Sequence, residues 1–264
     1  MPALGPRHHR VRRLRNLIRD PRARRDERAF VVEGPRGVEA AIDRGATLES
    51  AYVGPGAARA FSALTERLRT LDVAIDELKE GVLERIGDTV TPQPVLAVAS
   101  MTPPELDDLD RDRLVVVAVT VRDPGNAGTL LRSAEAAGAA GVVFCGNSVD
   151  PHAPKVVRSS AGAVFGVPVV EADDPVKVLE ALGRHGRRRL AAVASGGEEF
   201  DRVDLTGGVA IVLGNESAGI PPELDVHLDG RVTIPIEPPA ESLNVGMAGA
   251  VLAFEAVRQR RTAT

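Results

Sequence analysis

The chain has few aromatic residues and almost no cysteine. Of its 264 residues only 3% are aromatic, tryptophan is absent, and Cys145 is the single cysteine. One cysteine cannot form a disulfide within the chain, which indicates a reducing compartment. No apolar run approaches the roughly 18 residues that a membrane span needs, and the first residues lack the apolar stretch of a signal peptide. We therefore expect a cytoplasmic protein with no membrane partner.

Several common site motifs are also missing. The sequence contains no GxGxxG after a predicted strand and no GxxxxGK[ST], so neither a Rossmann dinucleotide site nor a P-loop is predicted. A GxSxG nucleophile elbow is absent as well. The five histidines are not spaced with Cys145 as metal ligands are, so no metal site is predicted. Hydride transfer, phosphoryl transfer and metal-dependent chemistry are therefore disfavoured.

The charge of the chain is unevenly distributed. The net charge is −4, but residues 1–30 carry ten arginines against three acidic residues, a net of +7, which leaves −11 on the remainder. A basic N-terminal arm on an acidic body indicates a polyanionic partner that is contacted locally. Arginine favours phosphate as the group recognised, because its planar guanidinium binds phosphate through two hydrogen bonds. The alternative interpretation is a solvated, mobile tail.

Hydrophobic patterning divides the chain into two α/β parts. Residues 1–100 contain short predicted strands and helices, among them a basic amphipathic helix over 11–19 and a helix over 57–70. Residues 101–113 are rich in proline and acidic residues and are predicted to be a linker. Residues 114–264 alternate strands with helices, which predicts a mostly parallel sheet covered on both faces.

Three polar loops follow predicted strands of the second part. The first spans 121–138, the second spans 212–224, and the third joins a predicted strand over 232–236 to a predicted helix over 246–260. In an open α/β sheet, ligands bind at the carboxyl ends of the strands, where such loops lie. The candidate polar side chains of these loops are Asn126, Arg132, Glu216, Ser242 and Asn244.

Each of these side chains also has an ordinary structural interpretation. Ser242 is expected to cap the helix that follows it, and Arg132 alone is typical of a solvated helix arginine. Asn126 and Arg132 lie less than two helical turns apart, so we expect both to face one cleft. Three polar loops at strand ends of one sheet favour a binding site over three independent turns.

The three loops, in this order, resemble the signature motifs of the SpoU (TrmH-like) RNA 2′-O-ribose methyltransferases of the SPOUT superfamily. The matching segments are DPGNAGTLLRSAEAAGAAGVVF, IVLGNESAGI and IPIEPPAESLNVGMAGAVLAFEAVRQR, and DPHAPKVVRSSAGAVFGVPVV resembles the segment between the first two. The resemblance covers residues 114–260. Residues 10–100 resemble that family's ribosomal-protein-like substrate-binding domain, through RNLIRDPRARRDERAFVVEGPRGVEAAI and TPQPVLAV.

The resemblance implies a fold, a cofactor and an assembly. The sheet would carry a C-terminal trefoil knot, a rare exception to unknotted topology. The knot would bring the second and third loops together as a pocket for S-adenosylmethionine. The chain would act as a homodimer with composite active sites, and small residues on the last helix would allow close packing, either there or within the chain. The cofactor would be held mainly through backbone groups by Gly214, Ile234 and Leu243, with Ala194, Leu213 and Asn215 nearby as further cofactor-binding residues.

The resemblance also implies how the reaction is divided among residues. Arg132 would be the catalytic arginine, and Asn126, Glu216, Ser242 and Asn244 its polar companions. A guanidinium hardly ever loses its proton. Arg132 would therefore act as base only under unusual activation, or would hold the adjacent phosphate while another group accepts the proton. RNA contacts are expected at Arg12, Arg15, Arg22, Arg25, Arg28, Lys155 and Arg158.

The function implied is S-adenosylmethionine-dependent 2′-O-methylation of structured RNA, with 23S ribosomal RNA favoured as substrate. A tRNA methyltransferase and an antibiotic-resistance rRNA methyltransferase remain alternatives. A non-catalytic RNA-binding or ribosome-assembly protein is the alternative of another class. Two positions depart from the usual motifs: Ala218 is expected to alter substrate contacts, and Gly246 to loosen the start of the last helix.

Overall fold

The computed structural model describes residues 2–87 and 92–263, which form two compact units. Thr91, the first residue of the segment TPQPVLAV, lies outside the described residues. The units divide the chain as follows: unit 1 is Met1–Thr102 with His152–Phe165, and unit 2 is Pro103–Pro151 with Gly166–Thr264.

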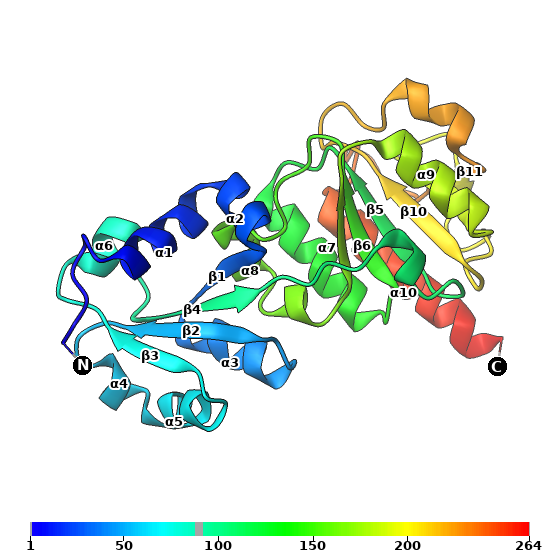
Figure 1. The fold of residues 1–264 in the computed structure, drawn as a ribbon. Coiled ribbons are helices and arrows are strands. Elements are labelled where there is room, and N and C mark those ends of the chain that lie inside the picture. Colours follow the sequence, from blue (N-terminus) through cyan, green and yellow to red (C-terminus); the bar gives the residue numbers. More distant parts are fainter. Residues whose placement is uncertain (1, 88–91, 264) are drawn as a thin grey trace. The chain divides into compact units, whose positions relative to one another are not determined.

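Unit 1 is built on a four-stranded sheet with the order β1-β4-β2-β3 (Figure 1). Strand β4 pairs antiparallel with both β1 and β2, and β3 pairs parallel with β2. Because β4 is central, its residues are buried up to the terminal Ser100. The strands are β1 (Ala29–Glu33), β2 (Leu48–Val53), β3 (Ala74–Glu77) and β4 (Val95–Ser100).

Helices cover both faces of this sheet (Figure 1). The helix predicted over 57–70 is broken at Phe61 into two shorter helices. Residues 152–165, which the sequence assigns to the second part, belong to unit 1 because α8 packs against β1. The helices are α1 (His9–Arg19), α2 (Pro21–Glu27), α3 (Pro35–Asp43), α4 (Ala57–Ala60), α5 (Ser62–Thr70), α6 (Val82–Ile86), α8 (Pro154–Ser159) and the 3₁₀ turn η2 (Ala163–Phe165).

The basic N-terminal segment is part of the folded unit and is not a mobile tail. Helix α1 is amphipathic and buries Val11, Leu14, Leu17 and Ile18 in the core of unit 1. Leu4 pairs with Leu78 by a parallel bridge, so even the residues before α1 are tied to the sheet. Residues 4–28 are therefore not a separate arm, although their exposed arginines keep this surface basic.

Helix α2 was not predicted from the sequence, because it is short and carries no apolar stripe. Its ends are nevertheless well defined. The side chain of Asp20 accepts a hydrogen bond from the backbone N–H of Arg22 at 2.9 Å, and Pro21 occupies the first turn. Arg28 ends the helix in the left-handed conformation, with φ 48°. An Asp-Pro pair is typical of a helix start, so Asp20-Pro21 could have predicted α2.

Unit 2 contains a seven-stranded sheet with the order β7-β6-β5-β10-β8-β11-β9. Every strand pair in it is parallel, which confirms the predicted parallel sheet. The two strands at its centre, β5 and β10, are buried at every residue, as their continuous apolar sequences require. The strands are β5 (Val115–Val119), β6 (Gly141–Cys145), β7 (Val169–Ala172), β8 (Arg188–Val193), β9 (Glu198–Glu199), β10 (Val209–Leu213) and β11 (Gly230–Thr233).

Helices α7 and α10 lie on one face of this sheet, and α9 with η3 on the other (Figure 1). Pro124, Pro175 and Pro222 each stand in the first turn of their helix, where a missing N–H costs nothing. The helical segments are α7 (Pro124–Ala136), α9 (Pro175–Arg184), α10 (Val245–Thr262) and the 3₁₀ turns η1 (Leu106–Asp108) and η3 (Pro222–His227). None of the described helices combines the length and apolarity needed to cross a bilayer.

The segment predicted as a linker is anchored to unit 2. Leu109 is 3% exposed in the core of that unit, beside η1. The guanidinium of Arg187, which is buried, donates hydrogen bonds to the backbone carbonyls of Asp110 and Arg113. Burial lowers the pKa of Arg187, although the nearby Asp110 and Asp112 oppose that effect. Residues 103–113 are thus held against the body of unit 2.

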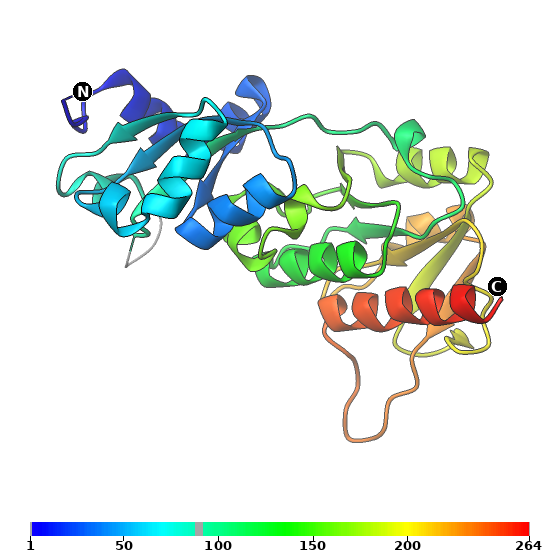
Figure 2. The ribbon, with the colours of Figure 1, turned by 90° about the horizontal axis from the view of Figure 1, so that it is seen from below.

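The third polar loop is longer than the sequence predicts, because β11 ends at Thr233 and not at residue 236. Pro235 has no N–H to donate to a neighbouring strand, which explains the early end. Figure 2 shows the segment between β11 and α10 extending away from the sheet. Residues 237–244 are all exposed.

Small residues let α10 approach α7 and β10 closely. A Cβ on Gly246 would lie 2.9 Å from Cβ of Thr129, and one on Gly249 would collide with the side chain of Leu130. Gly246, which was expected to loosen the start of the helix, permits this contact. The small residues on the inner side of α10 serve packing within the chain, while Met247 and Phe254 remain exposed.

Candidate active site

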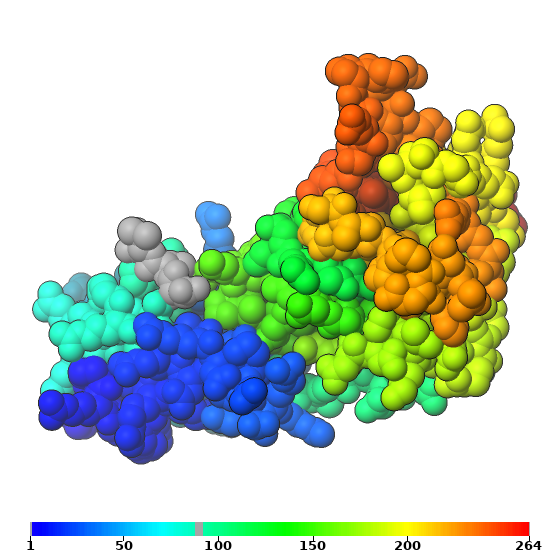
Figure 3. Space-filling model, turned by 90° about the horizontal axis from the view of Figure 1, so that it is seen from above, coloured from blue at the N-terminus to red at the C-terminus, as the bar shows by residue number. Residues whose placement is uncertain are grey.

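A cavity of about 510 Å³ opens at the carboxyl ends of β8, β10 and β11, next to the start of α10. All six residues expected to hold a cofactor line it, together with Glu216, Ser242 and Asn244 from the polar set. The space-filling view shows the third loop standing out from the surface beside this hollow (Figure 3). The full lining is Ala192, Val193, Ala194, Leu213, Gly214, Asn215, Glu216, Ser217, Gly219, Val232, Ile234, Ile236, Glu241, Ser242, Leu243, Asn244, Val245, Ala248 and Leu252.

The second loop is a tight turn closed by its own backbone. The N–H of Asn215 donates to the carbonyl of Gly219, and the N–H of Gly219 donates back to Asn215, each at 2.9 Å. Gly219 has φ +70°, a conformation that favours glycine. A Cβ on Gly214 would collide with the backbone of Gly219 and Ile220, so this position also requires glycine.

The side chain of Asn215 braces this turn from inside. Its Oδ1 accepts hydrogen bonds from the N–H groups of Ser217 and Ala218, both at 3.0 Å. Its Nδ2 donates to the carbonyl of Thr120 at 3.0 Å, at the end of β5. Thr120 has φ +56°, a strained conformation for a β-branched residue. Asn215 was expected to contact a cofactor. It lines the cavity, but its side chain is committed to these bonds and its backbone N–H and carbonyl to the bonds with Gly219.

The first loop starts α7 and turns Asn126 inward. The carboxylate of Asp123 caps the helix by accepting from the N–H of Asn126 at 2.8 Å. Asn126 is only 7% exposed. Sequence analysis did not single out Asp123, although Asp-Pro marks a helix start here as it does at Asp20.

Hydrogen bonds connect the three loops through their side chains. Asn126 Nδ2 donates to Glu216 Oε1 at 2.8 Å, and Asn244 Nδ2 donates to Asn126 Oδ1 at 2.7 Å. Asn244 Oδ1 in turn accepts from the N–H of Met247 at 3.2 Å, which caps α10. The cap of α10 is therefore Asn244, and the prediction of Ser242 in that role is wrong. Ser242 is instead exposed and lines the cavity.

The carboxylate of Glu216 is held in its charged form. Burial disfavours the charge, but hydrogen bonds from the Asn126 side chain and from the backbone N–H groups of Glu216, Asp123 and Arg122 outweigh it. Their combined effect lowers the pKa of Glu216 below its ordinary value.

Arg132 does not share the surroundings of Asn126. Six residues along a helix correspond to about a third of a turn in direction, so the two side chains of α7 diverge. Arg132 is exposed, does not line the cavity, and forms no hydrogen bond or ion pair with another described residue. The expectation that both face one cleft of a single chain is not met.

The cavity suits S-adenosylmethionine in size and chemistry. Its volume lies within the range of about 300–1,000 Å³ that small-molecule sites occupy. Apolar walls from Leu213, Ile234 and Leu252 face polar groups of the second and third loops, and the carboxylates of Glu216 and Glu241 match a positively charged ligand. Within residues 2–87 and 92–263, no lysine, arginine or histidine lines the cavity.

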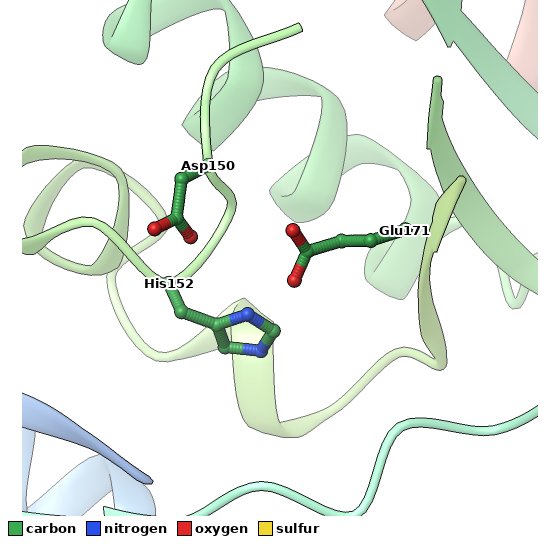
Figure 4. Close-up of side chains that lie close together, drawn as sticks. All are labelled: Asp150, His152 and Glu171. Carbon is green, nitrogen blue, oxygen red and sulfur yellow. The ribbon is translucent and has the colours of Figure 1, made fainter. Parts of the chain in front are cut away.

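A second group of ionisable side chains was not found from the sequence. Asp150 and Glu171 of unit 2 bring carboxylate oxygens within 4.8 Å of each other, and Figure 4 draws them with the imidazole of His152. Each of these side chains already interacts with other groups of the protein. We assign no metal to them.

The expected RNA contacts of unit 1 are unequal in exposure. Arg158 pairs with the carboxylate of Glu33, and Arg15 is only half-exposed, with a buried Nε. Five of the seven expected residues are exposed, namely Arg12, Arg22, Arg25, Arg28 and Lys155.

Comparison with known proteins agrees with this geometry. The family model described as SpoU rRNA Methylase family matches residues 113–254, and the MRM3-like substrate binding domain matches residues 8–97. The 23S rRNA (uridine(2479)-2′-O)-methyltransferase of Streptomyces viridochromogenes is 33% identical over 261 residues, which cover 93% of this chain and 88% of that protein.

Solved structures extend the likeness to both units. The SpoU methyltransferase AviRb from Streptomyces viridochromogenes, in complex with the cofactor AdoMet, superposes with a TM-score of 0.85 at 29% identity, over 97% of this chain and 99% of that one. The A. aeolicus TrmH/SpoU tRNA modifying enzyme superposes with a TM-score of 0.53 at 28% identity, over 59% of this chain and 79% of that one. The protein described here belongs to the SpoU rRNA methylase family.

Proposed function

We propose that this protein transfers the methyl group of S-adenosylmethionine to a ribose 2′-hydroxyl of 23S ribosomal RNA, in the cytoplasm. The observation that carries the proposal is the cavity of unit 2. It gathers every residue expected to hold the cofactor beside Glu216, Ser242 and Asn244, and the last two loops meet there although they are distant in sequence.

Ribosomal RNA is favoured over tRNA because of the extent of the likeness. The relative named as a 23S rRNA methyltransferase aligns with 93% of this chain, and thus with both units. The structure titled as a tRNA modifying enzyme aligns with 59% of it. Unit 1, with its exposed arginines on α1 and α2, is the part we propose to bind the rRNA, since guanidinium groups recognise phosphate.

The residues of unit 2 would divide the work by chemistry. When bound, S-adenosylmethionine supplies an electrophilic methyl group on a sulfonium that is already a good leaving group. Leu213, Ile234 and Leu252 would exclude water from the cavity, and the rigid turn around Gly214 would hold its ligand through backbone groups. The protein's main tasks are then to position the ribose oxygen and to provide for removal of its proton.

Arg132 would hold the phosphate next to the reacting ribose. Its exposure and its lack of a partner among the described residues leave the guanidinium available for an anion. A role as proton acceptor would require Arg132 to lose a proton that a guanidinium hardly ever loses.

The partner proposed for the exposed face of α10 is a second copy of this chain. Leu243, Met247 and Phe254 are 41%, 55% and 50% exposed, an apolar strip at the mouth of the cavity and along α10. In the part of the chain that the structure describes, no basic side chain lines the cavity, whereas the proposed RNA substrate is a polyanion. A homodimer would cover the strip and bring Arg132 of one copy to the cavity of the other.

The threading of the chain is proposed to be a trefoil knot. Support comes from the strand order, which inserts β10 between β5 and β8, and from the packing of the last helix, α10, on the first helix of unit 2, α7. A crystal structure in which residues 234–262 did not pass through a loop of unit 2 would remove this part of the proposal.

The experiment is methyl transfer from labelled S-adenosylmethionine to purified rRNA and tRNA. We expect label in 23S rRNA at a ribose 2′-oxygen, and mapping of 2′-O-methyl sites in a deletion strain would locate the nucleotide. Arg132→Ala should lower the rate at least about a hundredfold, because positioning is the enzyme's main contribution. Arg132→Lys should recover little, since an ammonium cannot bind phosphate through a planar fork.

The alternatives predict other results. Label in tRNA alone would replace the proposed substrate, and a methylated nucleotide in an antibiotic-binding site of the ribosome would indicate a resistance enzyme. An absence of transfer to both RNAs, with intact RNA binding, would favour a non-catalytic binding protein.

A further inference from the structure

The carboxylate of Glu216 accepts hydrogen bonds through both of its oxygens. Oε1 accepts from Asn126 Nδ2 at 2.8 Å and from the N–H of Asp123 at 3.4 Å, and Oε2 accepts from Asn215 Nδ2 at 3.2 Å. An ionised carboxylate has no proton to donate, whereas an amide side chain has a donor end and an acceptor end. The group next to Glu216 must therefore present its donor end.

This requirement propagates along the amides. Because Asn126 turns Nδ2 to Glu216, its Oδ1 faces the third loop, where it accepts from Asn244 Nδ2 at 2.7 Å. Because Asn244 turns Nδ2 to Asn126, its Oδ1 is free to accept from the N–H of Met247 and cap α10. One negative charge on the second loop thus sets the direction of every hydrogen bond up to the start of α10.

The two ends of this chain of amides differ in how firmly they are held. The side chain of Asn215 forms four hydrogen bonds, one to Glu216 Oε2, one to the carbonyl of Thr120 and two from backbone N–H groups of the second loop, so this loop is firmly braced. Residues 237–244 of the third loop are exposed. Among the described residues, the bond from Asn244 to Asn126 is the only side-chain hydrogen bond that joins 237–244 to either of the other loops.

We infer that Glu216 is a positioning residue, whose carboxylate fixes the direction of the Asn126–Asn244 amide pair and thereby holds the third loop at the cavity. The inference rests on the proposed function in one respect, the identity of the cavity's ligand. Glu216 is then not the proton acceptor of the reaction. Both of its oxygens are already occupied, and its lowered pKa makes it a weaker base than an ordinary glutamate.

The inference is tested by reversing the direction of the amides. In Glu216→Gln, both ends of the new amide face hydrogen-bond donors, Asn126 Nδ2 and Asn215 Nδ2. Its NH₂ group therefore opposes another donor in either orientation. In Asn244→Asp, the new carboxylate still caps α10 but faces Asn126 Oδ1, so two acceptors oppose each other. Each single variant should bind S-adenosylmethionine about tenfold more weakly, as measured by calorimetry.

The double variant, Glu216→Gln with Asn244→Asp, should restore binding. Asn126 can turn its amide over, so that its Oδ1 accepts from the amide introduced at position 216 and its Nδ2 donates to the carboxylate introduced at position 244. The amide at position 216 still accepts from Asn215. The negative charge has moved from position 216 to position 244, and the side-chain hydrogen bonds between 216, 126 and 244 are reversed in direction. We expect affinity within about threefold of wild type, although the 3.4 Å contact from Asp123 is lost.

Thermal unfolding of the protein without ligand should follow the same pattern, with two destabilised single variants and a recovered double variant. This readout keeps the inference testable if wild type fails to bind S-adenosylmethionine, a result that would defeat the proposed function alone. Asp174→Asn is the matched control, since it makes a similar exchange at the cap of α9, outside the three loops, and should leave affinity unchanged.

Two results would overturn the inference. One is a double variant whose fold-loss in affinity is the product of the single losses and whose loss of stability is their sum, because independent residues behave in that way. The other is a Glu216→Gln enzyme with normal affinity and a double variant with no turnover, which would assign proton acceptance to Glu216.

Discussion

Arginines of the same formal charge differ in what they can offer to RNA. Arg22 and Arg25 are exposed on α2, and neither side chain forms an ion pair with another described residue. Arg158 instead pairs with Glu33, whose side chain is only 8% exposed. A cation that already compensates a buried carboxylate supports the fold first, so these arginines should respond differently to substitution.

The double substitution Arg22→Ala and Arg25→Ala should weaken binding of 23S rRNA and reduce the slope of log affinity against log salt by about 1.5 to 2, because each phosphate contact contributes about 0.9. Arg158→Ala should instead cost roughly 1–3 kcal/mol of stability by removing the charge-assisted hydrogen bond from Arg158 to Glu33. Filter binding across a salt series and thermal unfolding measure the two effects.

A control of equal charge separates local contact from net charge. Arg67 and Arg69 lie on α5 and pair with Asp43 and Glu66. Replacing both with alanine should leave the salt slope unchanged. An equal reduction in slope for both pairs would show that α2 makes no specific contact.

The packing of α10 on α7 depends on two glycines of α10, of which Gly246 lies nearer the start of the helix. A Cβ on Gly246 would approach both Cβ and Cγ2 of Thr129, at 2.9 and 3.0 Å. Thr129 cannot easily turn away, because it is β-branched and its hydroxyl donates to the carbonyl of Gly125 at 2.9 Å.

Gly246→Ala should therefore lower the free energy of unfolding by about 1 kcal/mol, even though alanine is intrinsically the better helix former by a similar amount. It should also weaken cofactor binding, because the displaced helix start carries Asn244. Gly207→Ala is the control, since apart from its chain neighbours no described residue has an atom within 4 Å of a Cβ at this exposed position. Equal stability of the two variants would contradict the proposed contact.

Helices and strands were predictable wherever burial is periodic or continuous. The apolar run of β5 and the stripe of α1 are examples, since both elements are defined by what they bury. The differences from prediction arise where local residues set the bounds of an element. Pro235 ends β11 early, and Phe61 separates α4 from α5. Helix α2 was missed because its caps specify it and it has no apolar stripe.

The candidate site was predictable as a set of residues but not as an arrangement. The residue types and their order marked the three loops, and the cavity gathers the expected cofactor contacts. A sequence does not contain the directions of hydrogen bonds. It therefore could not show that Asn244 caps α10 or that the Asn215 side chain braces its own turn. The outward direction of Arg132 follows from helix geometry, but its destination requires knowledge of the assembly.

At the scale of the whole molecule, the proposed composite site rests on the separation of the cavity from Arg132. Among the described residues, two glutamates and no cation line the cavity, while Arg132 is exposed on the same helix that carries the buried Asn126. If two copies complete each other, one site uses the cavity and Asn126 of one chain with Arg132 of its partner. Two substitutions six residues apart on α7 would then damage different sites of a mixed dimer.

Coexpression of Asn126→Ala with Arg132→Ala, each nearly inactive alone, should therefore restore about a quarter of wild-type activity. With random pairing, half of the dimers are mixed, and each mixed dimer has one intact site of two. Sedimentation should show the dimer in every sample. Asn126→Ala paired with the doubly substituted chain is the control and should stay inactive, because every cavity then lacks Asn126. If the first mixture is no more active than its components, both residues act in one chain, and the composite site is refuted.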